Sequence, residues 1–184
     1  VRAHFSEFAS PAAIDIAGWF GEVCARTAKL MVEWMRVGFV HGVMNTDNMS
    51  IHGLTIDYGP YGWLEPYDLD WTPNTTDAQG RRYAFGRQPG IAQWNLAALG
   101  QALNVLEKNT EALQQSLNRY GEVFHEEYGR CFAAKLGLST LMHDDALLLD
   151  LFRCMARQET DYCLTFRLLA NLPLPDGSQT VLTD

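Results

Sequence analysis

The sequence lacks the features that would assign the chain to a membrane, a nucleic acid or an oxidising compartment. It has no apolar run of about 20 residues, the length that crosses a bilayer, and its first residues do not form a signal peptide. A net charge of −8 opposes binding to phosphate-rich nucleic acid, which attracts basic surfaces. The four cysteines show no C-x-x-C spacing, so we expect buried free thiols in a reducing compartment. We therefore predict no nucleic acid and no membrane among the partners.

The composition is that of a globular domain with a sizeable core. Of the 184 residues, 47% are hydrophobic and 20% are charged. We expect a single domain over residues 1–184. Apolar residues at helical spacing predict helices over residues 14–39, ended by Gly38, and over residues 90–106. Three more helices are expected from their capping residues, which are Asn109, Asp144 or Asp145, and Thr160 or Asp161, the last helix ending before Pro173.

The most informative segment is a polar loop at residues 41–48, which reads His-Gly-Val-Met-Asn-Thr-Asp-Asn and is followed nine residues later by Asp57. Carboxylate and amide oxygens are the hard ligands that Mg²⁺ prefers, with phosphates and waters completing its shell. Asn and Asp also fill ordinary turns, so the residue types alone leave both explanations open. The run at residues 49–56 is expected to form a small β-hairpin that turns at His52 and Gly53.

The order of these elements matches a protein-kinase-like catalytic lobe, in which a helix, a catalytic loop, a short hairpin and an Asp-aromatic-Gly triplet follow one another. Asn48 lies seven residues after His41, as the metal-binding Asn does in a kinase. The position of the kinase base, however, is Val43, and an acid stands instead at Asp47. The register therefore keeps a metal pair, Asn48 and Asp57, and argues against an ordinary protein kinase.

Two blocks of sequence resemble the SelO (selenoprotein O-like) family. The first block comprises residues 41–51 and 53–62, and the second comprises residues 80–85, 88–91 and 94–96. The resemblance extends over most of the chain, from about residue 26 to residue 172. It implies a mainly α fold with a short β-hairpin, namely a protein-kinase-like C-terminal lobe.

The resemblance also implies a reaction, protein AMPylation, in which AMP passes from ATP to Ser, Thr or Tyr hydroxyls of protein substrates. By motif position, Asp47 would be the proton acceptor. Asn48 and Asp57 would bind Mg²⁺, or Mn²⁺ in its place, and Asp57 would also contact the nucleotide. Arg2 would correspond to one of the family's nucleotide-binding arginines. The residues themselves leave open whether the α- or the γ-phosphate is attacked.

The small lobe of a kinase-like site is not recognisable in the chain. The residues before His41 include no strand-rich, glycine-rich stretch that would cover the phosphates. We therefore expect a catalytic lobe whose N-lobe lies outside this chain, and no activity from the chain by itself. Two alternatives stay open: a non-catalytic kinase-like remnant that serves as a binding module, and a phosphotransferase, which Val43 disfavours. The expected location is the bacterial cytoplasm, or the mitochondrion if the protein is eukaryotic.

The segment from residue 60 to residue 88 is expected to be irregular and ordered by its aromatic residues. It contains three arginines, Arg81, Arg82 and Arg87, for which two roles stay open. They would either contact phosphate or pair with nearby acids, which are Asp68, Asp70 and Asp77.

Overall fold

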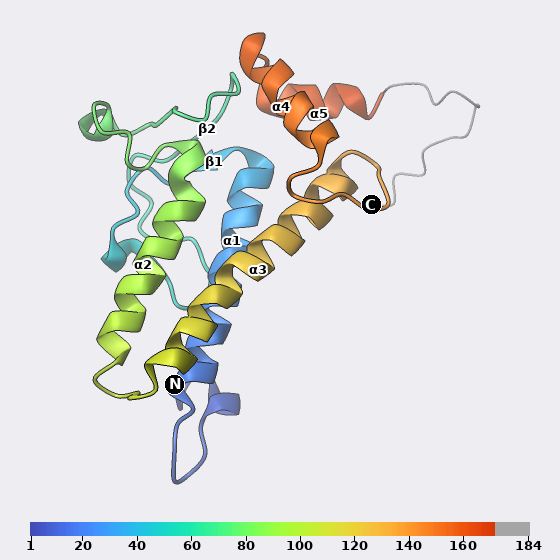
Figure 1. Ribbon diagram of the computed structural model, residues 1–184. Helices are drawn as coiled ribbons and strands as arrows, with labels where there is room; N and C mark the ends of the chain where they lie inside the picture. Colours follow the sequence, from blue (N-terminus) through green and yellow to red (C-terminus); the bar gives the residue numbers. More distant parts are fainter. Residues whose placement is uncertain (172–184) are drawn as a thin grey trace.

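The structure is a computed structural model that describes residues 1–171, and it is mainly helical (Figure 1). Two short strands and several single turns of 3-10 helix (η) connect the α-helices. In chain order the elements are η1 (Ser6–Phe8), α1 (Ile16–Val37), β1 (Phe39–Val40), η2 (Thr46–Asn48), β2 (Gly62–Trp63), η3 (Thr75–Asp77), η4 (Phe85–Arg87), α2 (Gln88–Leu103), α3 (Thr110–Lys135), α4 (Ala146–Arg157) and α5 (Tyr162–Leu169). The predicted mainly α class is confirmed, and the two strands form a small antiparallel sheet.

Helix α1 packs against both α2 and α3 and delivers the chain to the candidate site. Its first turn is capped by Asp15, whose carboxylate accepts a hydrogen bond from the Gly18 N–H at 2.8 Å. It ends at Gly38, which has a φ of 73°, a left-handed conformation that glycine adopts without strain. The predicted helix and its stop are confirmed. The polypeptide then enters β1 and the polar loop directly.

Two apolar cores hold the helices together. The first lies between α1, α2 and α3, and its largest fully buried members include Phe20 and Met31. The second gathers the end of α3, the helices α4 and α5, and Val40 of β1 around Tyr162. The Tyr162 hydroxyl donates to the Met35 carbonyl oxygen at 2.7 Å, which satisfies its buried polar atom. The end of α1 is therefore fixed to α5.

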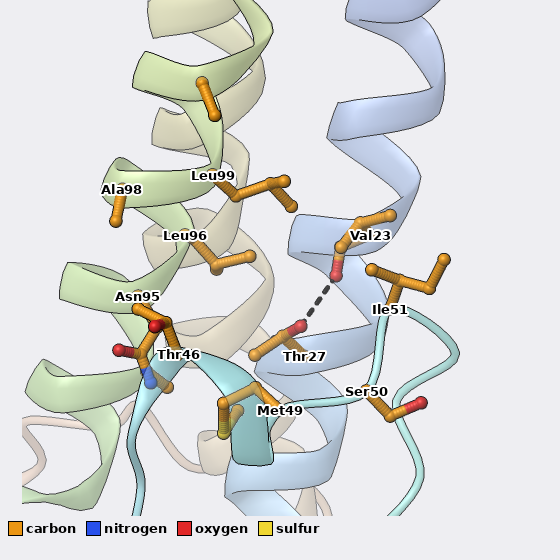
Figure 2. Close-up of a pocket in the computed structure, with 12 residues that line it drawn as sticks. Val23, Thr27, Thr46, Met49, Ser50, Ile51, Asn95, Leu96, Ala98 and Leu99 are labelled. Carbon is orange, nitrogen blue, oxygen red and sulfur yellow. Dashed lines mark hydrogen bonds between the residues drawn. The ribbon is translucent and has the colours of Figure 1, made fainter.

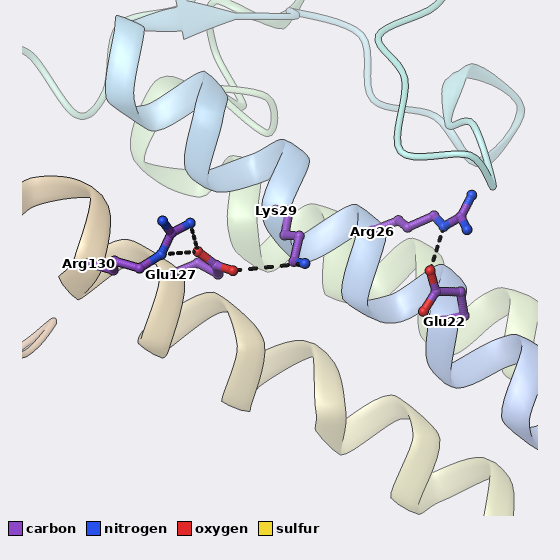
Figure 3. Close-up of polar contacts among 5 residues, drawn as sticks. All are labelled: Glu22, Arg26, Lys29, Glu127 and Arg130. Atoms are coloured by element: carbon purple, nitrogen blue, oxygen red, sulfur yellow. Dashed lines mark hydrogen bonds and ion pairs between the residues drawn. The ribbon is translucent and has the colours of Figure 1, made fainter. Parts of the chain in front are cut away.

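The exposed edge between α1 and α3 carries ion pairs (Figure 3). The Glu127 carboxylate of α3 lies 3.9 Å from Nζ of Lys29 on α1 and also accepts a hydrogen bond from Arg130 Nε at 2.8 Å. On α1 itself, Arg26 Nε lies 2.7 Å from a carboxylate oxygen of Glu22. Exposed pairs of this kind contribute roughly 0–1 kcal/mol each. The apolar cores, rather than these pairs, account for the packing of the two helices.

Capping residues begin the later helices where the sequence predicts. The Asn109 side chain accepts a hydrogen bond from the Ala112 N–H at the start of α3. Of the alternatives left open, Asp145 caps α4 and Asp161 caps α5, each through a hydrogen bond from a backbone N–H to its carboxylate. The final predicted helix ends at Leu169, and Pro173 lies outside the described residues.

The predicted hairpin over residues 49–56 is wrong. A turn does form there, because the Gly53 N–H donates to the Ser50 carbonyl at 3.2 Å. The returning segment does not pair with residues 49–51, however. Its polar groups are taken by other partners, Thr55 by the Trp34 indole N–H and Ile56 by the His41 ring. Within the described residues the two-stranded sheet is instead β1 with β2, antiparallel, in the register Phe39↔Trp63 and Val40↔Gly62.

The four cysteines are free thiols, but they are not all buried as predicted. Cys24 is buried in the first core, and this burial raises the pKa of its thiol to about 12. Cys131 is half-buried, whereas Cys154 and Cys163 are exposed. The two exposed residues lie on α4 and α5, short helices that bury only Leu148 and Met155, and Tyr162 and Phe166, respectively. No helix in the described part of the chain has the length and apolar character needed to span a membrane.

Candidate active site

His41 joins the two segments that carry the candidate site residues. Its side chain is fully buried, and its Nε2–H donates to the Ile56 carbonyl oxygen at 2.7 Å. Because a carbonyl can only accept, the proton must sit on Nε2, which leaves Nδ1 to accept from the Val43 N–H at 3.4 Å. The ring also stacks on Trp34 of α1, with 5.4 Å between centroids. The loop at residues 41–48 is thereby tied to the residue directly before Asp57.

Three buried amide side chains from later in the chain hold the backbone of this loop. Gln88, the first residue of α2, accepts from the His41 N–H at 3.0 Å and donates to the Phe39 carbonyl at 2.9 Å. Asn74 donates to the Gly42 carbonyl at 2.9 Å, and Asn95 of α2 donates to the Met44 carbonyl at 3.0 Å. Backbone groups that leave water need such partners. From the sequence we assigned no role to these three residues, although Gln88 and Asn95 lie within the second block that resembles the SelO family.

Asn48 is oriented so that its oxygen stays available. The residue ends η2, and its Nδ2 donates to the Val43 carbonyl at 3.0 Å. This bond identifies which terminal atom of the amide is nitrogen and leaves Oδ1 as an acceptor without a partner in the described part of the chain. The neighbouring Asp47 is exposed, and its carboxylate makes no hydrogen bond or ion pair with the residues that the structure describes. The two predicted residues therefore share one rigid turn.

Asp57 is held in a conformation that side-chain-bearing residues rarely adopt. Its φ is 53°, in the left-handed region, where Asp and Asn are among the few tolerated residues. The residue is exposed, and it follows the Ile56 carbonyl that His41 holds. Backbone strain of this kind costs about 1–3 kcal/mol and collects at functional sites. The strained position thus coincides with the residue that the motif selects for the metal.

The donor set suits Mg²⁺ rather than a metal held by protein alone. The described residues contain no group of three or more His, Cys, Asp or Glu side chains that could hold a metal ion. Mg²⁺ requires less, because it takes one or two protein oxygens and completes its octahedron with waters and substrate phosphates. One exposed carboxylate, at Asp57, and one oriented amide oxygen, at Asn48, fit that requirement.

Arg2 lies in an N-terminal segment that contacts the turn before Asp57. Its Nη1 donates to the Ser10 carbonyl at 2.6 Å, a contact within the same segment. The segment reaches the turn at residues 50–53 through Phe5, whose ring stacks on His52 with 5.1 Å between centroids. The structure thus brings the segment beside the turn that precedes Asp57, while the described contact of Arg2 is structural.

A second loop, at residues 77–83, is anchored to the candidate catalytic loop. The Asp77 carboxylate accepts hydrogen bonds from the Arg82 N–H at 2.9 Å and the Tyr83 N–H at 2.8 Å. The Tyr83 hydroxyl in turn donates to Asn45 Oδ1 at 2.5 Å, two residues before Asp47. Of the open roles for the arginines, pairing is found for Arg87, whose guanidinium lies 3.8 Å from Asp70.

A cavity of about 320 Å³ lies beside the loop at residues 41–48, between α1 and α2 (Figure 2). Its walls are mostly apolar, with Val23 of α1 opposite Leu96 and Leu99 of α2 (Figure 2). The Thr27 hydroxyl on this wall donates to the Val23 carbonyl at 2.8 Å. Thr46 and Met49 line the cavity, but Asp47 and Asn48 do not. The side chains that were predicted to act in the reaction, Asp47 and Asn48, therefore lie outside this cavity.

Comparison with known proteins identifies the family to which this fold and site belong. The family model described as protein adenylyltransferase SelO matches residues 1–181. The chain therefore belongs to the SelO family, as the resemblance implied.

Among its relatives are proteins named protein nucleotidyltransferase YdiU. One from Nitrosospira multiformis is 60% identical over 179 residues, which cover 95% of this chain and 32% of that protein. Another from Tolumonas auensis is 53% identical over 177 residues, covering 96% of this chain and 34% of the relative. A third, from Rhodopirellula baltica, is 53% identical over 188 residues, covering 98% and 35%. The chain thus spans about a third of the length of these curated relatives.

Proposed function

We propose that this chain carries the metal-binding and proton-accepting part of an Mg²⁺- and ATP-dependent protein adenylyltransferase. The single observation that carries the proposal is the hydrogen bond from His41 to the Ile56 carbonyl, which holds the turn with Asp47 and Asn48 and the strained Asp57 in one unit. Membership in the SelO family supports the chemistry, and relatives that are named nucleotidyltransferases agree with it.

The reaction assigns one role to each residue. The hydroxyl oxygen of a Ser, Thr or Tyr in the protein substrate forms a bond to the α-phosphorus of ATP. The bond from that phosphorus to the bridging oxygen breaks, and pyrophosphate leaves. Asp47, exposed and without a partner in the described residues, accepts the hydroxyl proton. Oδ1 of Asn48 and the carboxylate of Asp57 would hold Mg²⁺ or Mn²⁺, which supplies positive charge to the phosphate oxygens.

The rest of the nucleotide site is proposed to lie elsewhere in the intact protein. The helical unit with its small sheet corresponds in this view to a kinase-like C-terminal lobe, extending over residues 1–184. The chain spans about a third of its curated relatives, so a nucleotide-covering lobe has room outside it. We accordingly expect the chain alone to transfer no AMP and to bind ATP weakly, even with Arg2 in contact with the nucleotide. Bacterial relatives and free cysteines support a bacterial cytoplasmic location.

The test uses the intact protein, ATP labelled at the α-phosphate, and the Asp57→Ala and Asp47→Asn variants. We expect label on protein, and a loss of about 100-fold or more in rate for each variant, which is the usual effect of removing a catalytic acid or base or a charge-stabilising group. Asp150→Ala is the matched control, because Asp150 is an exposed carboxylate on α4 that pairs with Arg153 at 2.8 Å. Full activity in Asp57→Ala would contradict the proposal.

A binding module without catalysis is the second candidate. It is favoured by the exposed aromatic residues that follow Asp57, since Tyr58, Tyr61 and Trp63 are each more than 40% exposed. Tyr61 packs edge to face on both Tyr58 and Trp63, and these two pack edge to face on Phe39. If this candidate is correct, the intact protein would bind a partner protein but would transfer no label from α-labelled ATP to any acceptor.

A further inference from the structure

The loop at residues 77–83 presents a cation beside the proposed proton acceptor. The guanidinium of Arg82 lies over the exposed ring of Trp94, with 4.8 Å to the ring centroid, and 5.7 Å from the centroid of Tyr83. Arg81 next to it is also exposed. Neither guanidinium forms an ion pair with a carboxylate among residues 1–171. The positive charge of Arg82 is therefore available to a partner.

Tyr83 places Arg82 close to the loop at residues 41–48. The Tyr83 hydroxyl donates to Asn45 Oδ1 at 2.5 Å, two residues before Asp47. The Arg82 guanidinium lies 5.7 Å from the centroid of the Tyr83 ring, and Trp94, on which it stacks, belongs to the same helix as Asn95, whose amide holds the Met44 carbonyl at 3.0 Å. One aromatic side chain, Tyr83, therefore separates Arg82 from the loop that carries Asp47.

The loop is also preorganised. The Asp77 carboxylate fixes the backbone N–H groups of residues 82 and 83, and the Arg87 guanidinium holds the Gly80 carbonyl at 2.9 Å. Arg81 has a left-handed φ of 47° in this tight turn. A guanidinium whose backbone and stacking surface are already set loses little freedom when it binds a carboxylate.

We propose that Arg82, stacked on Trp94, is a specificity-determining residue that binds an acidic side chain close to the target hydroxyl in the protein substrate. This inference rests on the proposed function. The nucleotide phosphates meet Asn48 and Asp57, whereas Arg82 borders the Asn45 side of the same turn. A substrate segment that delivers its hydroxyl to Asp47 passes that side. The chain as a whole is acidic, with 22 Asp and Glu against 14 Lys and Arg. The local positive charge of Arg82 therefore favours an acidic side chain at one position of the substrate segment over the other positions.

The experiment measures kcat/KM of the intact protein with α-labelled ATP and three synthetic peptides. Each peptide has one serine, flanked by Glu, by Gln or by Lys at the same positions. We expect the Glu peptide to exceed the Gln peptide by about three- to tenfold, the range for one exposed to partly buried charged contact. In Arg82→Glu the order should reverse toward the Lys peptide, while the KM for ATP stays within about twofold of wild type.

Two further variants keep the result interpretable. Arg82→Gln removes the charge without placing a new carboxylate near Asp77, and it should erase the preference without reversing it. Arg119→Glu makes the same charge change on an exposed face of α3 and should leave the preference intact. Thermal unfolding of each variant verifies that it folds.

The outcomes separate the two claims. A wild-type protein that modifies all three peptides equally, or an Arg82→Glu variant that keeps the acidic preference, overturns the inference and leaves adenylyl transfer standing. A raised KM for ATP in Arg82→Glu with an unchanged peptide preference assigns Arg82 to the nucleotide and also overturns it. Absence of α-label on every peptide and on the protein itself overturns the proposed function and the inference with it.

Discussion

Replacing His41 by Phe isolates the hydrogen bond that joins the two halves of the candidate site. Phe retains an aromatic ring of similar size, so the stacking on Trp34 should survive. The ring loses its bond to the Ile56 carbonyl at 2.7 Å and its weaker contact with the Val43 N–H at 3.4 Å. A polar group left unpaired away from water costs about 1–3 kcal/mol. With one strong and one weak bond lost, we expect the free energy of unfolding to fall by about 2–3 kcal/mol.

The assay is urea denaturation of the chain, with His52→Phe as the matched control. His52 is also a stacked histidine, on Phe5, but its ring makes no hydrogen bond among the described residues, so its replacement should cost less than about 1 kcal/mol. In the intact protein, His41→Phe should also lower the rate of AMP transfer, because the Asp57 segment is no longer tied to the loop with Asp47. A loss of stability below about 0.5 kcal/mol together with full activity would refute the reasoning.

The remaining predictions concern backbone strain and one half-buried cation, Lys135. Gly42→Ala should destabilise the chain in urea by about 2–4 kcal/mol, because φ of Gly42 is 82° and an added Cβ would lie 2.6 Å from the Pro60 carbonyl oxygen. The control is Gly90→Ala in α2, whose Cβ would meet open space and which should be neutral or stabilising. Asp57→Gly should keep or raise the melting temperature, since it removes the strained φ of 53°, yet abolish AMP transfer; a clear drop in melting temperature would contradict the strain argument. Burial lowers the pKa of Lys135 from 10.5 to about 8. Between these pH values the unfolded chain therefore binds more protons than the folded chain. The contribution of Lys135 to stability should accordingly rise with pH above about 8. The measurement is the wild-type stability minus that of Lys135→Met from pH 7 to 10, and a flat difference would count against it.

The ends of the helices were predictable because their signals are local. Gly38, Asn109, Asp145 and Asp161 each act on backbone groups within their own turn, so the residue type places each helix end to within one residue. The hairpin prediction failed for the opposite reason. Strand pairing depends on which distant segment offers backbone partners, and β1 finds them in β2 across the whole loop.

The candidate site divides in the same way. The order of the motif selected Asn48 and Asp57, and the resemblance to the SelO family selected Asp47. Membership in that family is confirmed, whereas the catalytic and metal roles of these residues stay predictions. The residues that support them were not predictable. Gln88 and Asn95 reach the loop from a helix about 50 positions away, and no local pattern records such a contact.

The most direct test of the account is the fate of the α-phosphate. The intact protein is incubated with a protein acceptor, Mg²⁺ and ATP carrying the label on either the α- or the γ-phosphate, and the labelled protein is counted. We predict label on protein from the α-position only, lost in Asp57→Ala and retained in Asp150→Ala. Label from the γ-position only would contradict adenylyl transfer and assign the site to phosphotransfer.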